Sequence, residues 1–436
     1  MKDFLKEYAP ALLVALPPLF LVACLALFTL DFPYLDQWEF VPLLQKSHEG
    51  ALGFGDFWAQ HNEHRPAFPR AVMLGLAYAS DWDVRWEIAT NLLLAFALFT
   101  FLFSSMRRTA RGRGGTRWLA PLLSLLVFSL GQWENWFLGW QLQLFMNLLA
   151  VVLGFWIVAT SEGRWHWLAG AMLMGVLATY SFANGLLFWP LGLLGILVLP
   201  AENKRKRAAR AACWALVSAT VTASYLWDYQ PPGYHPSTNL VFENPDAYML
   251  YILKYMGAPL AGFSELGAAI AGAVGCTAFL SLAVWAIVKR PLPWPMLLFL
   301  IGLAGYAIGS AKLTGLGRLG FGSEQAMSPR YVTFADLLWI ANLGLGCVFV
   351  ATSPKPLRTV AGAFVLCVAA LVFATSLHGA YRWTERYHYR IEARDELLHG
   401  DEFDLLRRIH PEPEKIIERR PFLRRHGLSI FGSNTG

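Results

Sequence analysis

Three carboxylates follow closely on the first long apolar run of the chain. Asp31, Asp36 and Glu39 lie in the stretch DFPYLDQWEF, residues 31–40. A carboxylate at a membrane surface can take the proton of a hydroxyl nucleophile while a new bond forms. If residues 34–46 form a surface helix, Asp36 and Glu39 share one face, because residues three apart are neighbours on a helix. The stretch is therefore a candidate for acid–base chemistry, although such acids also keep a loop solvated.

A second polar group, HNEHRPAFPR at residues 61–70, precedes a short apolar segment. Pro66 and Pro69 suit the first turn of a helix, where no amide hydrogen is needed. The unpaired amides and the dipole at that end of a helix favour an anion. The residues expected to bind a phosphate there are Arg65, Arg70, His61 and His64.

The same stretch contains residue types that bind metals. His61, Glu63 and His64 are all ligand types, yet their spacing matches no strong metal-binding motif. The five cysteines lie inside apolar blocks, and no paired spacing suggests a zinc site or a disulfide. We therefore assign no metal ligands, and no cofactor is indicated with certainty. A divalent metal remains an alternative that is not favoured.

Two outer turns carry groups that suit a sugar or an acceptor. GQWENWFLGWQLQ, residues 131–143, combines tryptophans with amides and one acid, although tryptophans there also form the usual aromatic belt of membrane proteins. In YSFANG, residues 180–185, the Asn-Gly pair also suits an ordinary turn. The candidate sugar- or acceptor-binding residues are Trp133, Glu134, Asn135, Gln141 and Asn184.

A later segment brings an arginine and a tyrosine to the start of an apolar block. Arg330 and Tyr331 follow a Gly-rich loop and are further candidates for a phosphate, although an arginine there can also snorkel. Asp336 lies inside the block and should face protein or a cavity, because a lipid-facing carboxylate is costly.

The elements that position these residues must lie in a membrane. Of the 436 residues, 56% are hydrophobic and 15% charged, well below the roughly 25% charged residues of soluble proteins. Long apolar blocks approach the roughly 20 residues that a helix needs to cross a bilayer. We predict an all-α polytopic membrane protein with about eleven transmembrane helices. The blocks lie near residues 10–30, 85–105, 118–131, 141–160, 167–180, 185–200, 211–227, 263–288, 296–312, 331–352 and 358–378.

Basic loops set the expected orientation. The loop at 107–117 carries five arginines and no acid, and the loop at 202–210 carries five lysines and arginines. We expect both in the cytoplasm, because short basic loops are retained there. This distribution also argues against a nucleic-acid-binding face. The segments expected outside are 31–84, with a surface helix over 66–80, then 228–262, 312–330 and the tail.

The chain is expected to have two parts. Residues 1–378 form the transmembrane module, in which 31–84 is the first outer loop with surface helices. Residues 379–436 form an outward-facing helical tail of mixed charge. Neither a Gly-rich phosphate loop nor a dinucleotide fingerprint is present in the sequence, which disfavours a nucleotide-driven pump.

Three of these motifs together resemble those of a known family. LDQWEF (35–40) resembles the acidic motif, EHRPAFPR (63–70) the later part of the first outer loop, and SPRY (328–331) a later motif of the GT-C superfamily of polytopic glycosyltransferases. That superfamily includes protein O-mannosyltransferases and aminoarabinose transferases. The layout of the whole chain is similar, although each motif is short. Here the acids are not adjacent, and His-Arg-Pro replaces a double proline.

The resemblance implies a function at the membrane surface. Sugar would pass from a polyprenyl-phosphate-linked donor to a glycan, lipid or protein acceptor, with inversion, in the bilayer of a bacterial inner membrane and at its periplasmic face. Carried onto this chain, it makes Asp36 the base, with Glu39 beside it. It assigns the donor phosphate to Arg65, His64 and Arg330.

Two other functions fit the same composition. An O-antigen ligase or polymerase usually has paired arginines in a large late outer loop, whereas residues 312–330 hold only Lys312, Arg318 and Arg330. A lipid-linked sugar transporter or flippase would place charges deep within several spans, and few are found, mostly near span ends.

Overall fold

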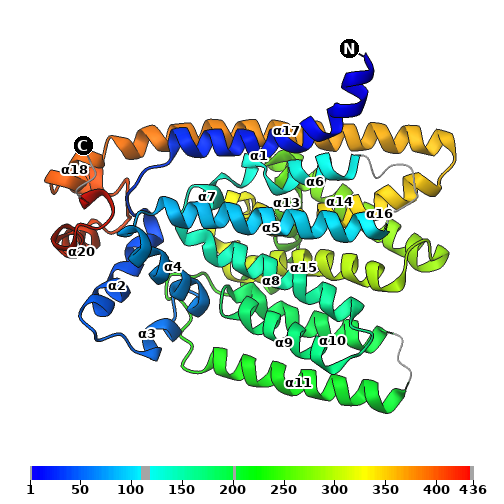
Figure 1. Cartoon of the computed structure of the whole chain (residues 1–436), viewed down its shortest axis with the longest axis horizontal. Coiled ribbons are helices and arrows are strands. Elements are labelled where there is room, and N and C mark those ends of the chain that lie inside the picture. Colours follow the sequence, from blue (N-terminus) through cyan, green and yellow to red (C-terminus); the bar gives the residue numbers. More distant parts are fainter. Residues whose placement is uncertain (1, 110–117, 200–202, 433–436) are drawn as a thin grey trace.

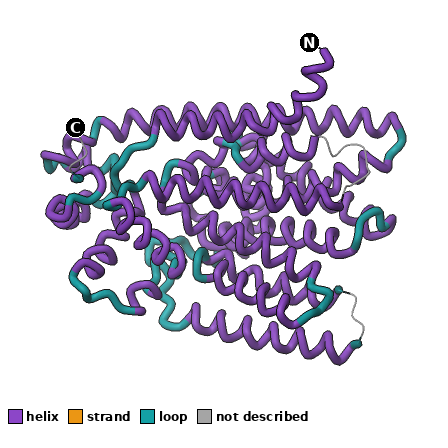
Figure 2. The backbone as a smooth tube through the Cα atoms, in the orientation of Figure 1, coloured by secondary structure: helices purple, strands orange, loops and turns teal. Residues whose placement is uncertain are grey.

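The computed structural model describes residues 2–109, 118–199 and 203–432, and within these ranges the chain is helical and has no strand (Figures 1 and 2). The membrane class predicted from composition is confirmed at this level. Of the two basic loops, residues 110–117 and 202 lie outside the described residues.

Seven helices in the described ranges are long and apolar enough to cross a membrane. Two apolar helices are shorter, α9 (Trp165–Thr179) and α10 (Phe188–Val198). The expected blocks near 118–131 and 211–227 form α6 (Leu119–Val127) and α11 (Lys204–Leu226), which are not among the seven. The seven helices are α1 (Lys2–Phe28), α5 (Arg85–Thr109), α8 (Leu142–Thr160), α14 (Glu265–Lys289), α15 (Trp294–Arg318), α16 (Pro329–Thr352) and α17 (Lys355–Ile391).

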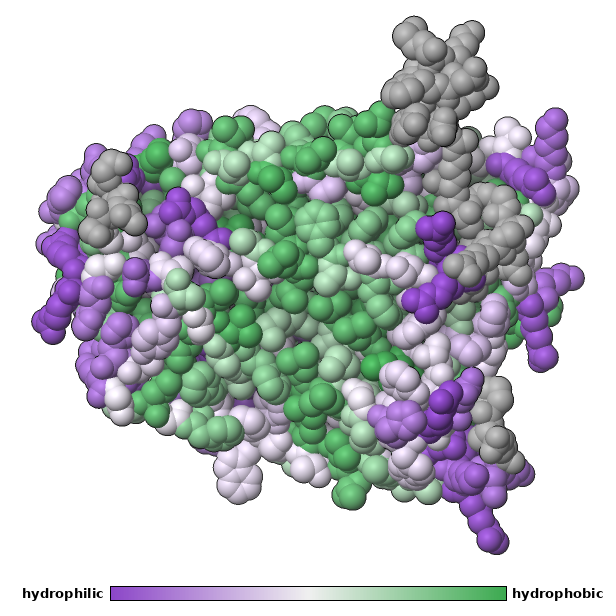
Figure 3. Space-filling view, viewed as in Figure 1, coloured by the Kyte–Doolittle hydropathy of each residue, from purple (hydrophilic) through white to green (hydrophobic). Residues whose placement is uncertain are grey.

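The long helices lie side by side and run between the two ends of the molecule (Figure 1). Figure 3 shows a broad hydrophobic band between hydrophilic side chains at both ends, the pattern of a protein embedded in a bilayer. We call the end with residues 31–84 and 392–432 the capped end, and the opposite end, where α11 begins and α16 turns into α17, the basic end. The capped end carries α2 (Val41–His48), α3 (Phe54–Trp58), α4 (Ala67–Ser80), α18 (Arg394–His399), α19 (Phe403–Leu406) and α20 (Pro413–His426).

The segment 228–262 is not wholly an outer loop. Its second half forms α13 (Pro245–Ala261), which packs along α14 and also contacts α16. The approach to α14 is so close that a Cβ atom on Gly257 would lie 1.8 Å from the carbonyl oxygen of Ala268. Sequence periodicity missed this helix because its buried face is built from tyrosines, such as Tyr251 and Tyr255, as much as from aliphatic residues.

The tail is not a separate unit. The expected division at residues 378 and 379 falls inside α17, which continues without a break to Ile391. Beyond it, the tail shares a hydrophobic core with the first outer loop. From the loop this core takes Phe32, Trp38, Phe40, Leu44 and Trp82, and from the tail Leu397, Leu406, Ile409, Ile416 and Leu423.

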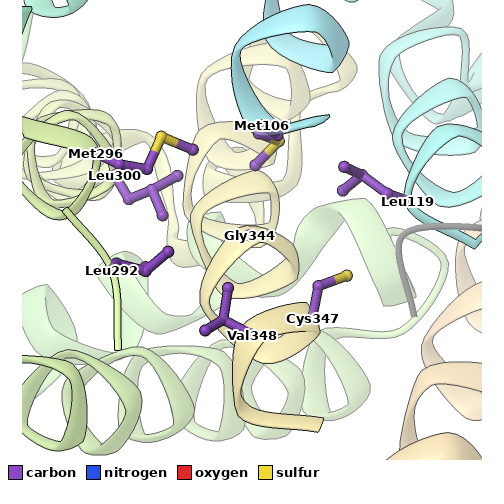
Figure 4. A pocket seen from close by; sticks show the side chains of 8 residues that line it. All are labelled: Met106, Leu119, Leu292, Met296, Leu300, Gly344, Cys347 and Val348. Atoms are coloured by element: carbon purple, nitrogen blue, oxygen red, sulfur yellow. The ribbon is translucent and has the colours of Figure 1, made fainter. Parts of the chain in front are cut away.

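A small gap remains between helices toward the basic end (Figure 4). Its volume is only ≈ 10 Å³, about the space of one water molecule. The eight residues that line it are Met106, Leu119, Leu292, Met296, Leu300, Gly344, Cys347 and Val348. With this apolar lining, the gap is a packing defect and offers no chemistry.

Candidate functional site

The first acidic motif forms a short 3₁₀ turn, η1 (Leu35–Phe40), followed by α2, in place of one helix over 34–46. The turn is held from two sides. The Leu35 amide donates to the Ile409 carbonyl of the tail at 3.0 Å. Gln37 donates to the Glu87 carboxylate of α5 at 2.7 Å. Residues three apart lie in line on a 3₁₀ helix, so Asp36 and Glu39 still share a face.

Asp36 is held in place yet open to solvent. Its side chain is 43% exposed, and the His61 Nε2 atom lies 3.7 Å from its Oδ2 atom. Burial of the carboxyl would raise its pKa, but His61 and the positive charge of Arg330 outweigh this effect and hold the pKa of Asp36 below its usual range. The group is therefore ionised at neutral pH and is reached by solvent.

Glu39 is engaged differently, by the tail. Lys415 donates to its Oε1 atom at 2.8 Å, and Arg419 lies 3.1 Å from its Oε2 atom. Burial alone would raise the pKa of Glu39, but these two cations lower it. Its carboxylate therefore fastens η1 to α20, and this is a positioning role.

The HNEH stretch forms a tight turn that sends its side chains to different partners. His61 and His64 exchange two backbone hydrogen bonds of 2.8 Å, and Asn62 between them has φ of 50°. His61 reaches Asp36, whereas the Glu63 Oε1 atom pairs with Arg318 at 2.8 Å. Burial opposes ionisation of Glu63, yet His64 and Arg318 lower its pKa to about 2. This acid is therefore a charged partner and is poorly suited to accept a proton.

His64 is a neutral, buried ring. It stacks on Phe182 with 4.0 Å between ring centroids, and its Nδ1 atom accepts from the Ala183 amide at 3.1 Å. Burial lowers the pKa of His64 to about 4, so the ring carries no charge for a phosphate at neutral pH. Among the described residues, no group of three His, Cys, Asp or Glu side chains is arranged to hold a metal ion.

Arg65 and Arg70 bind backbone carbonyls. Arg65 donates to the carbonyl oxygens of Trp58, Tyr225 and Trp227. The whole residue is only 4% exposed. Arg70 is likewise buried and donates to three carbonyls at the end of α3. The structure thus uses both arginines to fix loops, and neither is free for the phosphate contact expected of it.

Arg330 is the predicted phosphate-binding residue that stays open. Its side chain is 44% exposed and lies 3.4 Å from Glu134. Its Nε atom also donates to the Ser328 hydroxyl at 3.1 Å. Tyr331 stacks on Tyr255, and its buried hydroxyl has no hydrogen-bond partner in the described part of the chain.

The predicted sugar-binding residues divide into two groups. Asn135 is fully buried and donates to the Arg330 carbonyl and the Thr333 hydroxyl, while Gln141 and Asn184 are also buried. These amides therefore support the surrounding backbone. Trp133 and Glu134, in contrast, line an open cleft of ≈ 530 Å³.

Sequence reasoning gave no role to Arg318 or His235. Arg318 ends α15 and pairs with Glu63, and the His235 Nε2 atom lies 3.8 Å from the same carboxylate. One signal for Arg318 was available, a cation at the end of an apolar span on the outer side. His235 lies in an irregular loop, where no periodicity reports on contacts.

Comparison of the chain with protein-family models, curated proteins and solved structures finds no match. The resemblance to GT-C glycosyltransferases therefore rests on the three motifs. In the fold, Asp36 of the first motif lies 3.7 Å from His61, two residues before the second motif, and the charge of Arg330 in the third motif lowers the pKa of Asp36.

Proposed function

We propose that the chain is an integral membrane glycosyltransferase. It moves a sugar from a polyprenyl-phosphate-linked donor to a hydroxyl acceptor at the capped end. The observation that carries this proposal is Asp36: an ionised carboxylate, held by its turn, half open, and electrostatically linked to Arg330. A positioned base near an exposed cation is what displacement of a phosphate requires.

In the proposed reaction Asp36 accepts the proton of the acceptor hydroxyl. The hydroxyl oxygen forms a bond to the anomeric carbon, and the bond from that carbon to the phosphate oxygen breaks. The electron pair leaves with the polyprenyl phosphate, and Arg330 stabilises its growing negative charge. Attack from the face opposite the leaving group inverts the anomeric carbon.

The other acids of the capped end are weaker candidates for the base than Asp36. Glu39 is paired with Lys415 and Arg419, and Glu63 is paired with Arg318. Asp31 lies 3.7 Å from Arg85, yet burial and the neighbouring Asp83 raise its pKa to about 6, so it is the rival base that an Asp31→Asn variant tests. The side chains of these three acids are 23–26% exposed, against 43% for Asp36, so Asp36 is the acid most open to an acceptor hydroxyl.

The capped end is proposed to face the periplasm of a bacterial inner membrane. The opposite end carries lysines and arginines at the start of α11 and around the turns that follow α14 and α16. Short basic loops of this kind stay in the cytoplasm.

The test is transfer by the purified protein in nanodiscs. Polyprenyl-phosphate-linked sugars are supplied with a lipid and glycan extract as acceptor, and the anomeric configuration of the product is read by NMR. The proposal predicts a product of inverted configuration. Movement of the intact lipid-linked sugar across the bilayer without bond cleavage would support a transporter instead, and retention would exclude direct displacement.

A further inference from the structure

The ≈ 530 Å³ cleft lies next to the proposed reaction centre and is not used by it. Its walls come from the α7 turn with Trp133 and Glu134, from the α13–α14 connection with Phe263, and from α17. Glu134, which lines the cleft, is also the partner of Arg330. The cleft therefore adjoins Arg330 through a shared side chain.

One wall of the cleft carries a row of basic groups. His378, Arg382 and Arg386 line it and recur at every fourth position of α17, a spacing that puts side chains on one helix face. The Arg382 side chain is 50% exposed. Two arginines and a histidine in one row match the charge of a phosphate group.

The acids of the cleft are largely neutralised from outside it. Glu134 faces Arg330 at 3.4 Å, and Glu265 pairs with Lys254 at 2.5 Å. Glu324 is a third acid in the lining. Glu134 and Glu265 thus have cationic partners of their own. On α17, Arg382 in turn lies 3.2 Å from Glu385, which is not part of the lining, so a phosphate at Arg382 competes with Glu385.

The surface around the cleft is apolar. Phe263 is 47% exposed, and on α14 the neighbouring Leu266 is 72% exposed. On α17, Phe373 is 54% and Leu377 47% exposed, directly before the basic row begins. The cleft thus stands where a lipid-facing surface gives way to charge, which is the level of lipid headgroups.

We propose that this cleft binds the phosphate headgroup of a membrane lipid. The phosphate contacts His378, Arg382 and Arg386, and the hydrocarbon chain lies against the exposed apolar side chains of α14 and α17. The volume lies within the range of pockets that hold small-molecule groups. Headgroup binding needs no turnover, so this proposal stands or falls separately from the sugar-transfer function.

The test is lipid binding to the whole protein in detergent, measured by native mass spectrometry. The probes are undecaprenyl phosphate, the matched alcohol undecaprenol, phosphatidylglycerol and inorganic phosphate. We expect both phosphate lipids or undecaprenyl phosphate alone to bind, with undecaprenol bound at least about tenfold more weakly. Equal binding of undecaprenol, or binding of inorganic phosphate as tight as that of the lipids, would overturn the proposal.

Variants of the α17 arginines test whether the phosphate binds in this cleft. Arg382→Gln with Arg386→Gln should weaken phosphate-lipid binding by at least about tenfold, because each removes a charged hydrogen-bond donor. Arg407→Gln is the matched control, since Arg407 is an exposed arginine paired with Asp404 on the tail and is not part of the cleft lining. An equal loss in the control would show nonspecific charge attraction and refute the site. If the double variant fails to fold, Arg382→Gln alone carries the same expectation.

Discussion

The two ends of this helical bundle use charge in different ways. At the basic end, charged residues contact groups close to them in the sequence, as Arg164 does with Glu162 and Arg358 with the Ser353 carbonyl. The gap toward that end is small and apolar (Figure 4). At the capped end, charged residues from distant parts of the chain face one another: Asp36 meets His61, Glu63 meets Arg318, and Glu39 meets Lys415. Charge at the basic end fits a role in orientation, whereas paired charge at the capped end builds a site.

The capped end itself contains two kinds of ionic group. Glu39, Glu63 and Arg65 are bound by protein partners that hold the loops together. Asp36 and Arg330 are about two-fifths exposed. Residue type alone therefore does not identify a functional residue. Among the acids and among the arginines, the more exposed side chain is the better candidate for contact with a substrate.

The largest effect is expected at Asp36. Asp36→Asn keeps the size of the side chain but cannot accept a proton, so turnover should fall on the order of 10²–10⁴-fold. Binding of the polyprenyl-phosphate donor, followed separately, should remain. Asp31→Asn is the comparison, because Asp31 pairs with Arg85 whereas Asp36 pairs with His61, and an equal loss there would break the distinction between the two acids.

Arg330 should have the next largest effect. Arg330→Ala removes the cation proposed to face the leaving phosphate, and turnover should fall on the order of 10²-fold. Arg330→Lys should restore only part of it, since lysine lacks the planar fork of arginine. Full activity of Arg330→Ala in the sugar-transfer assay would move the phosphate site elsewhere.

Glu39 should have a smaller, indirect effect. Glu39→Gln loosens η1 from α20, and turnover should fall by about tenfold or less, because the base is misplaced but present. The folded pKa of Glu39 lies below its unfolded value. Its contribution to stability is therefore present at neutral pH and is lost as pH falls through the folded pKa. Thermal unfolding of wild type and variant should converge at acid pH, and a constant difference would contradict this role.

The basic end should show the smallest effect. Met296→Leu changes the shape of the apolar gap with little change in volume, a kind of swap that usually costs less than about 1.5 kcal/mol. Turnover and donor binding should stay at the wild-type level. A specific loss of activity with unchanged stability would mean that the basic end takes part in the reaction.

Much of the architecture could be predicted from the sequence. Apolar blocks located most long helices, and paired prolines located the start of α4 at Ala67. The segment with Tyr251 and Tyr255 was missed as a helix, since aromatic residues at helical spacing dilute the hydropathy signal. The boundary placed at residue 378 falls inside α17, which remains helical after its apolar residues end.

Some of the contacts among the candidate residues follow from local motifs. Asp36, His61 and Arg330 were all named from local motifs, and the fold brings them together. The roles of Arg65 and Arg70 could not be predicted from the sequence. Arg65 binds the carbonyl of Tyr225, which is distant in the chain, and Arg70 binds carbonyls whose positions depend on where α3 ends. Likewise, nothing local to Glu39 reveals its partner Lys415 in the distant tail.

Chemical rescue of the base is the most direct test of the central claim. Asp36→Gly leaves a space that opens to solvent, since the native side chain is 43% exposed, and formate can occupy such a space as a substitute base. Sugar transfer by Asp36→Gly should therefore rise with formate concentration and saturate, while Glu39→Gln and wild type do not respond. No increase in Asp36→Gly, or the same increase in all three proteins, would contradict the assignment of Asp36 as the base.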